Sequence, residues 1–78
     1  MPGIHMRSND GFIAPVTKSD TNVLKGLSWL RVGGAGNLVI EGANGQEVTL
    51  AVTAGEYVPF NEGKVKLATD ATGIVAFG

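Results

Sequence analysis

The chain is 78 residues long, which leaves room for one small hydrophobic core. It contains no cysteine and one histidine, so disulfides, thiolate metal sites and a zinc site built by this chain alone are excluded. Six Lys and Arg residues against seven Asp and Glu, without clusters, argue against nucleic acid as a partner, and no apolar run reaches the roughly 20 residues of a membrane span.

The first ten residues contain turn formers and few apolar side chains, and they lack the apolar stretch of a signal peptide. We predict a flexible arm over residues 1–10, which would order only against a neighbouring subunit or a capsid, and a single β domain over residues 11–78. His5 is the sole conventional general base, and a mobile histidine in such an arm is more common than a catalytic one.

Short runs rich in Val, Leu, Ile and Thr follow, separated by glycine-containing turns at intervals of roughly 8–12 residues. This pattern predicts an all-β fold, a small antiparallel β-sandwich or barrel, jelly-roll-like, of about seven short strands. The predicted strands are residues 12–16, 27–32, 38–41, 47–52, 57–60, 65–68 and 74–77.

Between the first two predicted strands lies the sequence SDTNVLKGL. Ser19 or Asp20 could cap a single helical turn there, which Gly26 would end. A loop is an equally good interpretation of this stretch.

The second predicted strand, LSWLRV, has apolar side chains on both faces. Alternation places Trp29 and Arg31 on one face. Leu30 and Val32 occupy the other. A core position for Trp29 is slightly favoured, and the alternative is a contact with another subunit, because Trp, Tyr and Arg are enriched at interfaces.

Three glycines in the sequence VGGAGN, Gly33, Gly34 and Gly36, raise the question of a phosphate-binding loop. Such a loop precedes a helix, whereas the residues after Gly36 continue directly into a β-branched strand. Val39 occupies the position of the third glycine in the dinucleotide-binding motif. The glycines are therefore interpreted as turn residues.

The dipeptide Asn44-Gly45 is typical of the two central positions of a type I′ turn, and it predicts a hairpin over residues 38–52. Alternation should place Leu38 and Ile40 on one side of the first strand. In the second strand, Val48, Leu50 and Val52 should lie on the side opposite to Glu47, Thr49 and Ala51.

The later strands contain signals of a sheet edge. Pro59 belongs on an edge strand or at a bend, because proline has no N–H to donate to a neighbouring strand. In KVKLA, Lys64 and Lys66 alternate with Val65 and Leu67, which predicts a half-buried strand with its lysines pointing outward.

No set of catalytic residues can be named. The seven carboxylates lie in predicted turns or at outward positions, the ordinary solvated placement. Asp20, Glu62 and Asp70 lie in predicted loops and could meet in space, although a chance placement is the simpler account. Without cysteine and with serines only in loops or at strand ends, no nucleophile with its base is apparent. We therefore predict a protein that is not an enzyme and has no cofactor.

The order of several segments resembles the small spike base proteins of tailed phages and gene transfer agents. These segments are SDT, VGGAGN, IEGANGQEVTL, VTAGEYVPF and KLATDATGIVAFG, and the resemblance runs from about residue 12 to residue 78. The resemblance implies a non-enzymatic virion component on the outside of a capsid, a head decoration or the base of a spike or fibre. Members typically have arginines before the closing segment, where this chain has Lys64 and Lys66.

From the resemblance and the small core we expect a symmetric homo-oligomer, a trimer or a pentamer, made in the host cytoplasm and placed on the capsid surface. Its partners would be the major capsid protein and a spike or fibre protein, with no nucleic acid and no membrane. The alternative is a carbohydrate- or receptor-binding module of a phage tail that stacks sugars on Trp29 and Tyr57. The candidate interface residues are Trp29, Arg31, Tyr57, Lys64 and Lys66.

Overall fold

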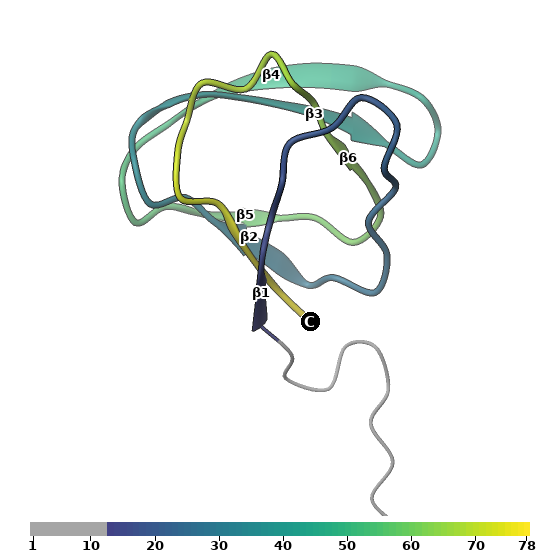
Figure 1. The fold of residues 1–78 in the computed structure, drawn as a ribbon, viewed down its shortest axis with the longest axis horizontal. Helices are drawn as coiled ribbons and strands as arrows, with labels where there is room; N and C mark the ends of the chain where they lie inside the picture. Colours follow the sequence, from purple (N-terminus) through teal and green to yellow (C-terminus); the bar gives the residue numbers. More distant parts are fainter. Residues whose placement is uncertain (1–12) are drawn as a thin grey trace, which may run out of the picture.

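The computed structural model describes residues 13–78, and the regular elements in this range are seven β-strands in two antiparallel sheets (Figure 1). Sheet A contains, in order, β1 (Ile13–Pro15), β7 (Val75–Phe77), β2 (Trp29–Arg31) and β5 (Tyr57–Pro59). Sheet B contains β4 (Glu47–Val52), β3 (Gly36–Gly42) and β6 (Gly63–Val65). The predicted all-β fold is confirmed, in the form of a sandwich.

The predicted arm, residues 1–10, lies outside the described residues, and so does His5. Among the residues described, no helix could cross a membrane.

The core fills the space between the two sheets. Alternate residues of sheet A point into it, so Leu30, Val58 and Ala76 are buried while their neighbours on the same strands are more exposed. The buried cluster consists of Leu27, Leu30, Val32, Leu38, Val52, Val58, Phe60, Val65, Ala71, Ile74 and Ala76.

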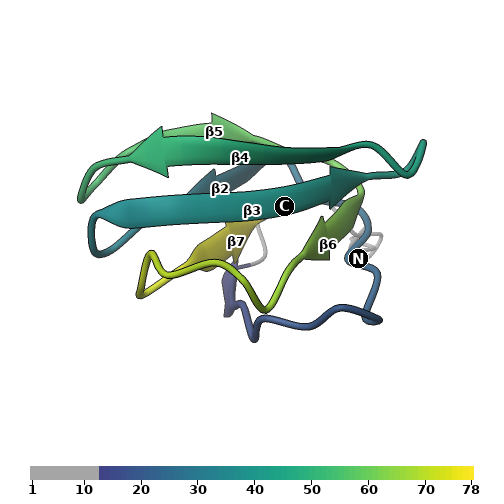
Figure 2. The same cartoon turned by 90° about the horizontal axis from the view of Figure 1, so that it is seen from above.

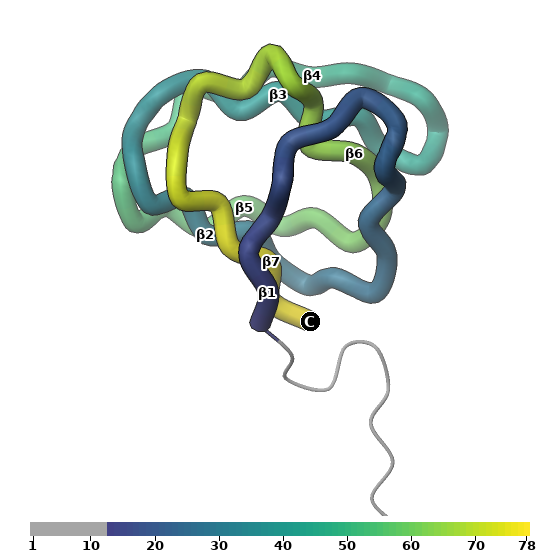
Figure 3. The backbone as a smooth tube through the Cα atoms, in the orientation of Figure 1, coloured from purple at the N-terminus to yellow at the C-terminus, as the bar shows by residue number. Residues whose placement is uncertain are grey.

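The last strand of the chain lies inside sheet A, between β1 and β2 (Figure 3). The glycine segment after β2 packs against the residues that lead into this strand. Gly33 and Gly34 both donate their N–H groups to the carbonyl of Thr72, at 3.0 and 2.8 Å, and a Cβ on Gly34 would collide with the Thr72 hydroxyl. Gly33 and Gly34 connect β2 to β3, as predicted, whereas Gly36, also predicted as a turn residue, is the first residue of β3. The close approach that Gly34 allows was not predicted.

The hairpin of β3 and β4 is confirmed, but its predicted type I′ turn is wrong. No residue other than glycine has a positive φ in the described part of the chain, so Asn44 cannot occupy the first position of that turn. The Gly45 N–H instead donates to the Gly42 carbonyl at 2.9 Å, and the Gly42 N–H donates to Gln46 at 2.9 Å. This is a three-residue loop, in which a type I turn is followed by Gly45 at a φ of +82°.

Strand β6 begins and ends earlier than predicted. It covers residues 63–65, and the chain then turns away, which leaves Leu67 exposed, although an inward position was predicted. Lys66 still donates its N–H to the carbonyl of Val39 at 2.8 Å, but the strand does not continue beyond it.

The segment between β1 and β2 has no helical turn. The Ser19 hydroxyl accepts hydrogen bonds from the N–H groups of Thr21 and Asn22, as a cap would, at 3.1 and 3.0 Å. The Ser19 N–H donates to Val65 and the Leu24 N–H to Gly63, so this segment runs along the outer edge of β6. These bonds to β6 hold the segment extended.

Candidate interaction surface

The outer face of sheet A, which points away from sheet B, is almost entirely apolar. Strand register aligns its side chains in two rows across the four strands. The first row is Ile13, Phe77, Trp29 and Pro59, and the second is Pro15, Val75, Arg31 and Tyr57. We call these eight residues the apolar face.

Three of the predicted interface residues, Trp29, Arg31 and Tyr57, lie together on the apolar face. Trp29 is 46% exposed and Tyr57 is 53% exposed, so the favoured prediction of a core tryptophan is wrong. The physical reason is alternation along β2, which gives the core position to Leu30 and turns both neighbours outward.

The aromatic side chains of the apolar face contact one another. The rings of Tyr57 and Phe77 are 6.0 Å apart between centroids, and the guanidinium carbon of Arg31 lies 5.9 Å from the centroid of the Tyr57 ring. These are ordinary distances for an aromatic pair and for a cation–π contact. The one charged side chain of this face therefore lies over an aromatic ring.

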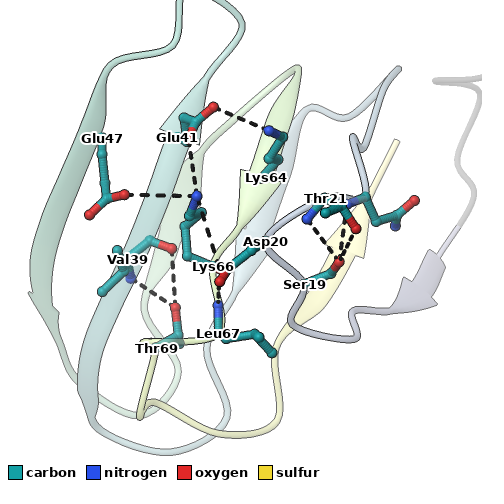
Figure 4. Close-up of polar contacts among 11 residues, drawn as sticks. Ser19, Asp20, Thr21, Val39, Glu41, Glu47, Lys64, Lys66, Leu67 and Thr69 are labelled. Carbon is teal, nitrogen blue, oxygen red and sulfur yellow. Dashed lines mark hydrogen bonds and ion pairs between the residues drawn. The ribbon is translucent and has the colours of Figure 1, made fainter.

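The two predicted lysines belong to a different region, at the outer face of sheet B (Figure 4). Glu41 on β3 accepts a hydrogen bond from Lys66 at 3.1 Å and pairs with Lys64 at 3.4 Å. Lys66 also lies 3.9 Å from a carboxylate oxygen of Asp20 and 3.9 Å from one of Glu47. The edge position predicted for this strand is confirmed, but its lysines are partly buried in ion pairs instead of pointing freely outward.

The ion pairs shift two pKa values. The hydrogen bond from Lys66 holds the pKa of the Glu41 carboxyl below its usual value, and burial opposes this effect only in part. The same hydrogen bond raises the pKa of the Lys66 ammonium. Glu41 is thus a paired and partly buried carboxylate, contrary to the ordinary solvated placement that we predicted for all seven.

A residue that sequence reasoning missed is Thr69, which is 2% exposed. Its hydroxyl accepts a hydrogen bond from the Val39 N–H at 2.9 Å and donates to the Val39 carbonyl at 3.1 Å. The hydroxyl therefore continues the bonding of β3 at the place where β6 has ended. A threonine in a loop gives no signal of such a role in one sequence.

Two of the three loop carboxylates, Asp20 and Asp70, have separate structural partners. Asp20 accepts the N–H of Leu67 at 3.0 Å, and Asp70 accepts the N–H of Asn37. Among residues 13–78, no group of three or more His, Cys, Asp or Glu side chains is placed to hold a metal ion.

Comparison with known proteins gives one informative match. No family model matches the sequence, and no curated protein matches it. Among solved structures, a chain described as "Capsid of native GTA particle computed with C5 symmetry", GTA being a gene transfer agent, is similar with a TM-score of 0.78 and 33% sequence identity. The match covers 86% of this chain and 81% of the other.

The β-sandwich of residues 13–78 and this match show that the chain is a capsid-related structural protein of virions. Within that class, identity and coverage at these levels mean that it belongs to the same family as the chain from the gene transfer agent capsid.

Proposed function

We propose that this protein is a structural component of the capsid surface, a head decoration protein or the base of a spike or fibre, and that it acts as a symmetric homo-oligomer. The apolar face is the surface between copies. The observation on which the proposal rests is this face itself, with Trp29 and Tyr57 about half exposed on it, in a relative of a capsid chain.

Physical reasoning supports self-association. An 8.0 kDa chain has a small core, and the described chain has neither disulfide nor metal cluster to stabilise it. Large contiguous apolar patches are uncommon on monomers, and they mark interaction sites. Contact between copies would remove this surface from water.

A closed ring is the expected arrangement, either a trimer or a pentamer, since a head-to-tail contact that failed to close would polymerise. The C5 symmetry used for the related capsid favours the pentamer. The major capsid protein and a spike or fibre protein are the proposed partners of the assembled ring.

The substitution Trp29→Glu tests this proposal. A buried, unpaired carboxylate at the contact would cost several kcal/mol, so we expect the oligomer to dissociate at micromolar concentration. Leu67→Glu is the matched control, because Leu67 is also exposed and apolar but lies outside the apolar face. Light scattering after size-exclusion chromatography measures the mass of each variant.

A wild-type protein that stays at about 8 kDa across the micromolar range would contradict the proposal. The alternative is then the carbohydrate- or receptor-binding module, which is favoured by the exposure of Trp29 and Tyr57 on one face. The carbohydrate-binding hypothesis predicts that the protein binds sugar and that Trp29→Ala abolishes this binding.

A further inference from the structure

The two sheets have four outer edges, and three of them are protected against further pairing. On β1 and β5, Pro15 and Pro59 each occupy a position where the missing N–H would point away from the sheet, because the neighbouring residues make the bonds to the adjacent strand. The edge of β6 is covered by the backbone of Ser19 and Leu24.

The fourth edge, β4, has no such protection in the described part of the chain. The bond from the Gly42 N–H to Gln46 fixes the alternation, so Val48, Leu50 and Val52 direct their backbone groups to β3. The N–H and C=O groups of Thr49 and Ala51 then point outward from the edge. This strand of six residues contains no proline, lysine or bulge, the usual devices that prevent pairing at an edge.

The side chains of β4 define what could pair with it. Toward the interior, Val48 is 42% exposed and Leu50 is partly buried, so both have apolar surface that an added strand would cover. On the outer face, Glu47 is exposed and acidic. A suitable partner is an extended segment with apolar side chains on its inner side and basic side chains on its outer side.

We propose that residues 3–8 of a neighbouring copy of this chain add to the edge of β4 as an extra strand. In this segment, GIHMRS, the apolar Ile4 and Met6 alternate with the basic or titratable His5 and Arg7. Four alternating residues are too few to predict a strand from sequence, but an existing edge supplies the template. Arg7 or His5 would then lie on the same face as Glu47.

The donor is a second copy because β1 and β4 lie on opposite sides of the sandwich. β1 is the edge of sheet A farthest from β5, whereas β4 lies over β5 (Figure 2). The link from Ser8 to Ile13 spans up to about 17 Å when extended, so the β1 strand of the donor would lie within that distance of the β4 edge that it joins. Each copy would donate one strand and accept one, an arrangement that a closed ring allows. The exchange of strands rests on the oligomer of the proposed function.

The chain has no cysteine, so introduced cysteines report only on their own positions. We would prepare Met6→Cys and Val48→Cys as separate full-length chains with tags of different mass, refold them together and treat them with a short bismaleimide. The expected result is a cross-linked pair that contains one chain of each kind. Met6→Cys mixed with Leu67→Cys is the matched control, and it should give little cross-linking.

A second substitution in the Val48→Cys chain tests the backbone pairing. Thr49→Pro removes the N–H group that points outward from the middle of β4 and leaves the hydrogen bonds to β3 in place, whereas Thr49→Val keeps this N–H group. We expect Thr49→Pro to lower the cross-linked fraction up to about tenfold, the effect of one lost hydrogen bond, and Thr49→Val to leave it unchanged. Circular dichroism would verify that both variants remain folded, and an edge variant of Ala51, Ala51→Pro, replaces Thr49→Pro if that chain does not fold.

The inference would be overturned if Met6→Cys cross-linked equally well to Leu67→Cys and to Val48→Cys, or if Thr49→Pro left the cross-linked fraction unchanged. It would also be overturned if the double variant Met6→Cys/Val48→Cys formed its cross-link within one chain. Light scattering on the same samples separates the two proposals. An intact oligomer without the cross-link overturns strand addition alone, whereas a monomer overturns the proposed function as well.

Discussion

Gly45 closes the turn between β3 and β4 in a conformation that other residues adopt only with strain. Its φ is +82°, and a Cβ built on it meets no atom within 4 Å, so the cost of a side chain comes from the backbone alone. We predict that Gly45→Val lowers the free energy of unfolding by about 1–2 kcal/mol. Gly45→Asn should cost less, because Asn tolerates positive φ. Urea denaturation measures both, and an unchanged midpoint in Gly45→Val would contradict this account of the turn.

The Thr69 hydroxyl makes the hydrogen bonds to the Val39 backbone at the place where β6 has ended. Thr69→Val keeps the shape of the side chain but leaves the Val39 N–H without its buried partner. We predict a loss of about 1–3 kcal/mol in stability. Thr69→Ser retains the hydroxyl and should lose less, as measured by thermal unfolding of the two variants. Equal losses would mean that packing of the methyl group, and not the hydrogen bonds, is the important contribution.

Among the elements, the β3–β4 hairpin shows what its sequence could and could not predict. The predicted alternation of Leu38, Ile40, Val48 and Leu50 is correct, and the observed register pairs Leu38 with Leu50 and Ile40 with Val48. A two-residue turn at Asn44-Gly45 would shift this register by one and pair apolar with polar positions. Burial of the apolar side chains therefore selects the three-residue loop over the local preference of the dipeptide.

The positions of the candidate interface residues in the fold could be predicted only in part, for a similar reason. Alternation identified Trp29 and Arg31 as neighbours on one face, and Tyr57 joins them through the pairing of β2 with β5. The ion pairs of Lys64 and Lys66 were missed, because they depend on which strand lies beside β6. A single sequence does not contain that long-range information.

The ion pairs around Glu41 connect β3 with β6 and make sheet B sensitive to acid. Because the pKa of Glu41 is lower in the folded protein, its contribution is fully present above the unfolded value of about 4.3 and is lost as the pH falls through the lowered value. We predict that Glu41→Gln flattens the fall in melting temperature below about pH 4.3. The raised pKa of Lys66 acts at the other extreme, where its contribution is lost as the pH rises above about 10.4.

Melting temperatures between pH 3 and 7 would check the acid side of this prediction. Glu62→Gln, which changes an exposed carboxylate in a loop, is the control. Parallel pH profiles of the wild type and Glu41→Gln would contradict a stabilising role for these pairs.

In the whole molecule, the outer faces of the two sheets differ in polarity. Sheet A presents the apolar face, whereas sheet B presents Glu41, Glu47 and the lysines that pair with them. A sandwich with one apolar and one charged outer face has a defined orientation in any assembly. The apolar face is suited to permanent contact with protein, and the charged face to contact with water.

The position of β7 between β1 and β2 also has a consequence for how the protein is made. Sheet A cannot close until residues 75–77 have left the ribosome, because β1 and β2 have no direct pairing with each other. The pairing of β3 with β4, by contrast, joins segments that are adjacent in the sequence and is expected to form early in folding. Before β7 pairs with β1 and β2, sheet A is therefore incomplete while the edge of β4 is already open. At that stage the chain is most exposed to aggregation and to degradation by proteases.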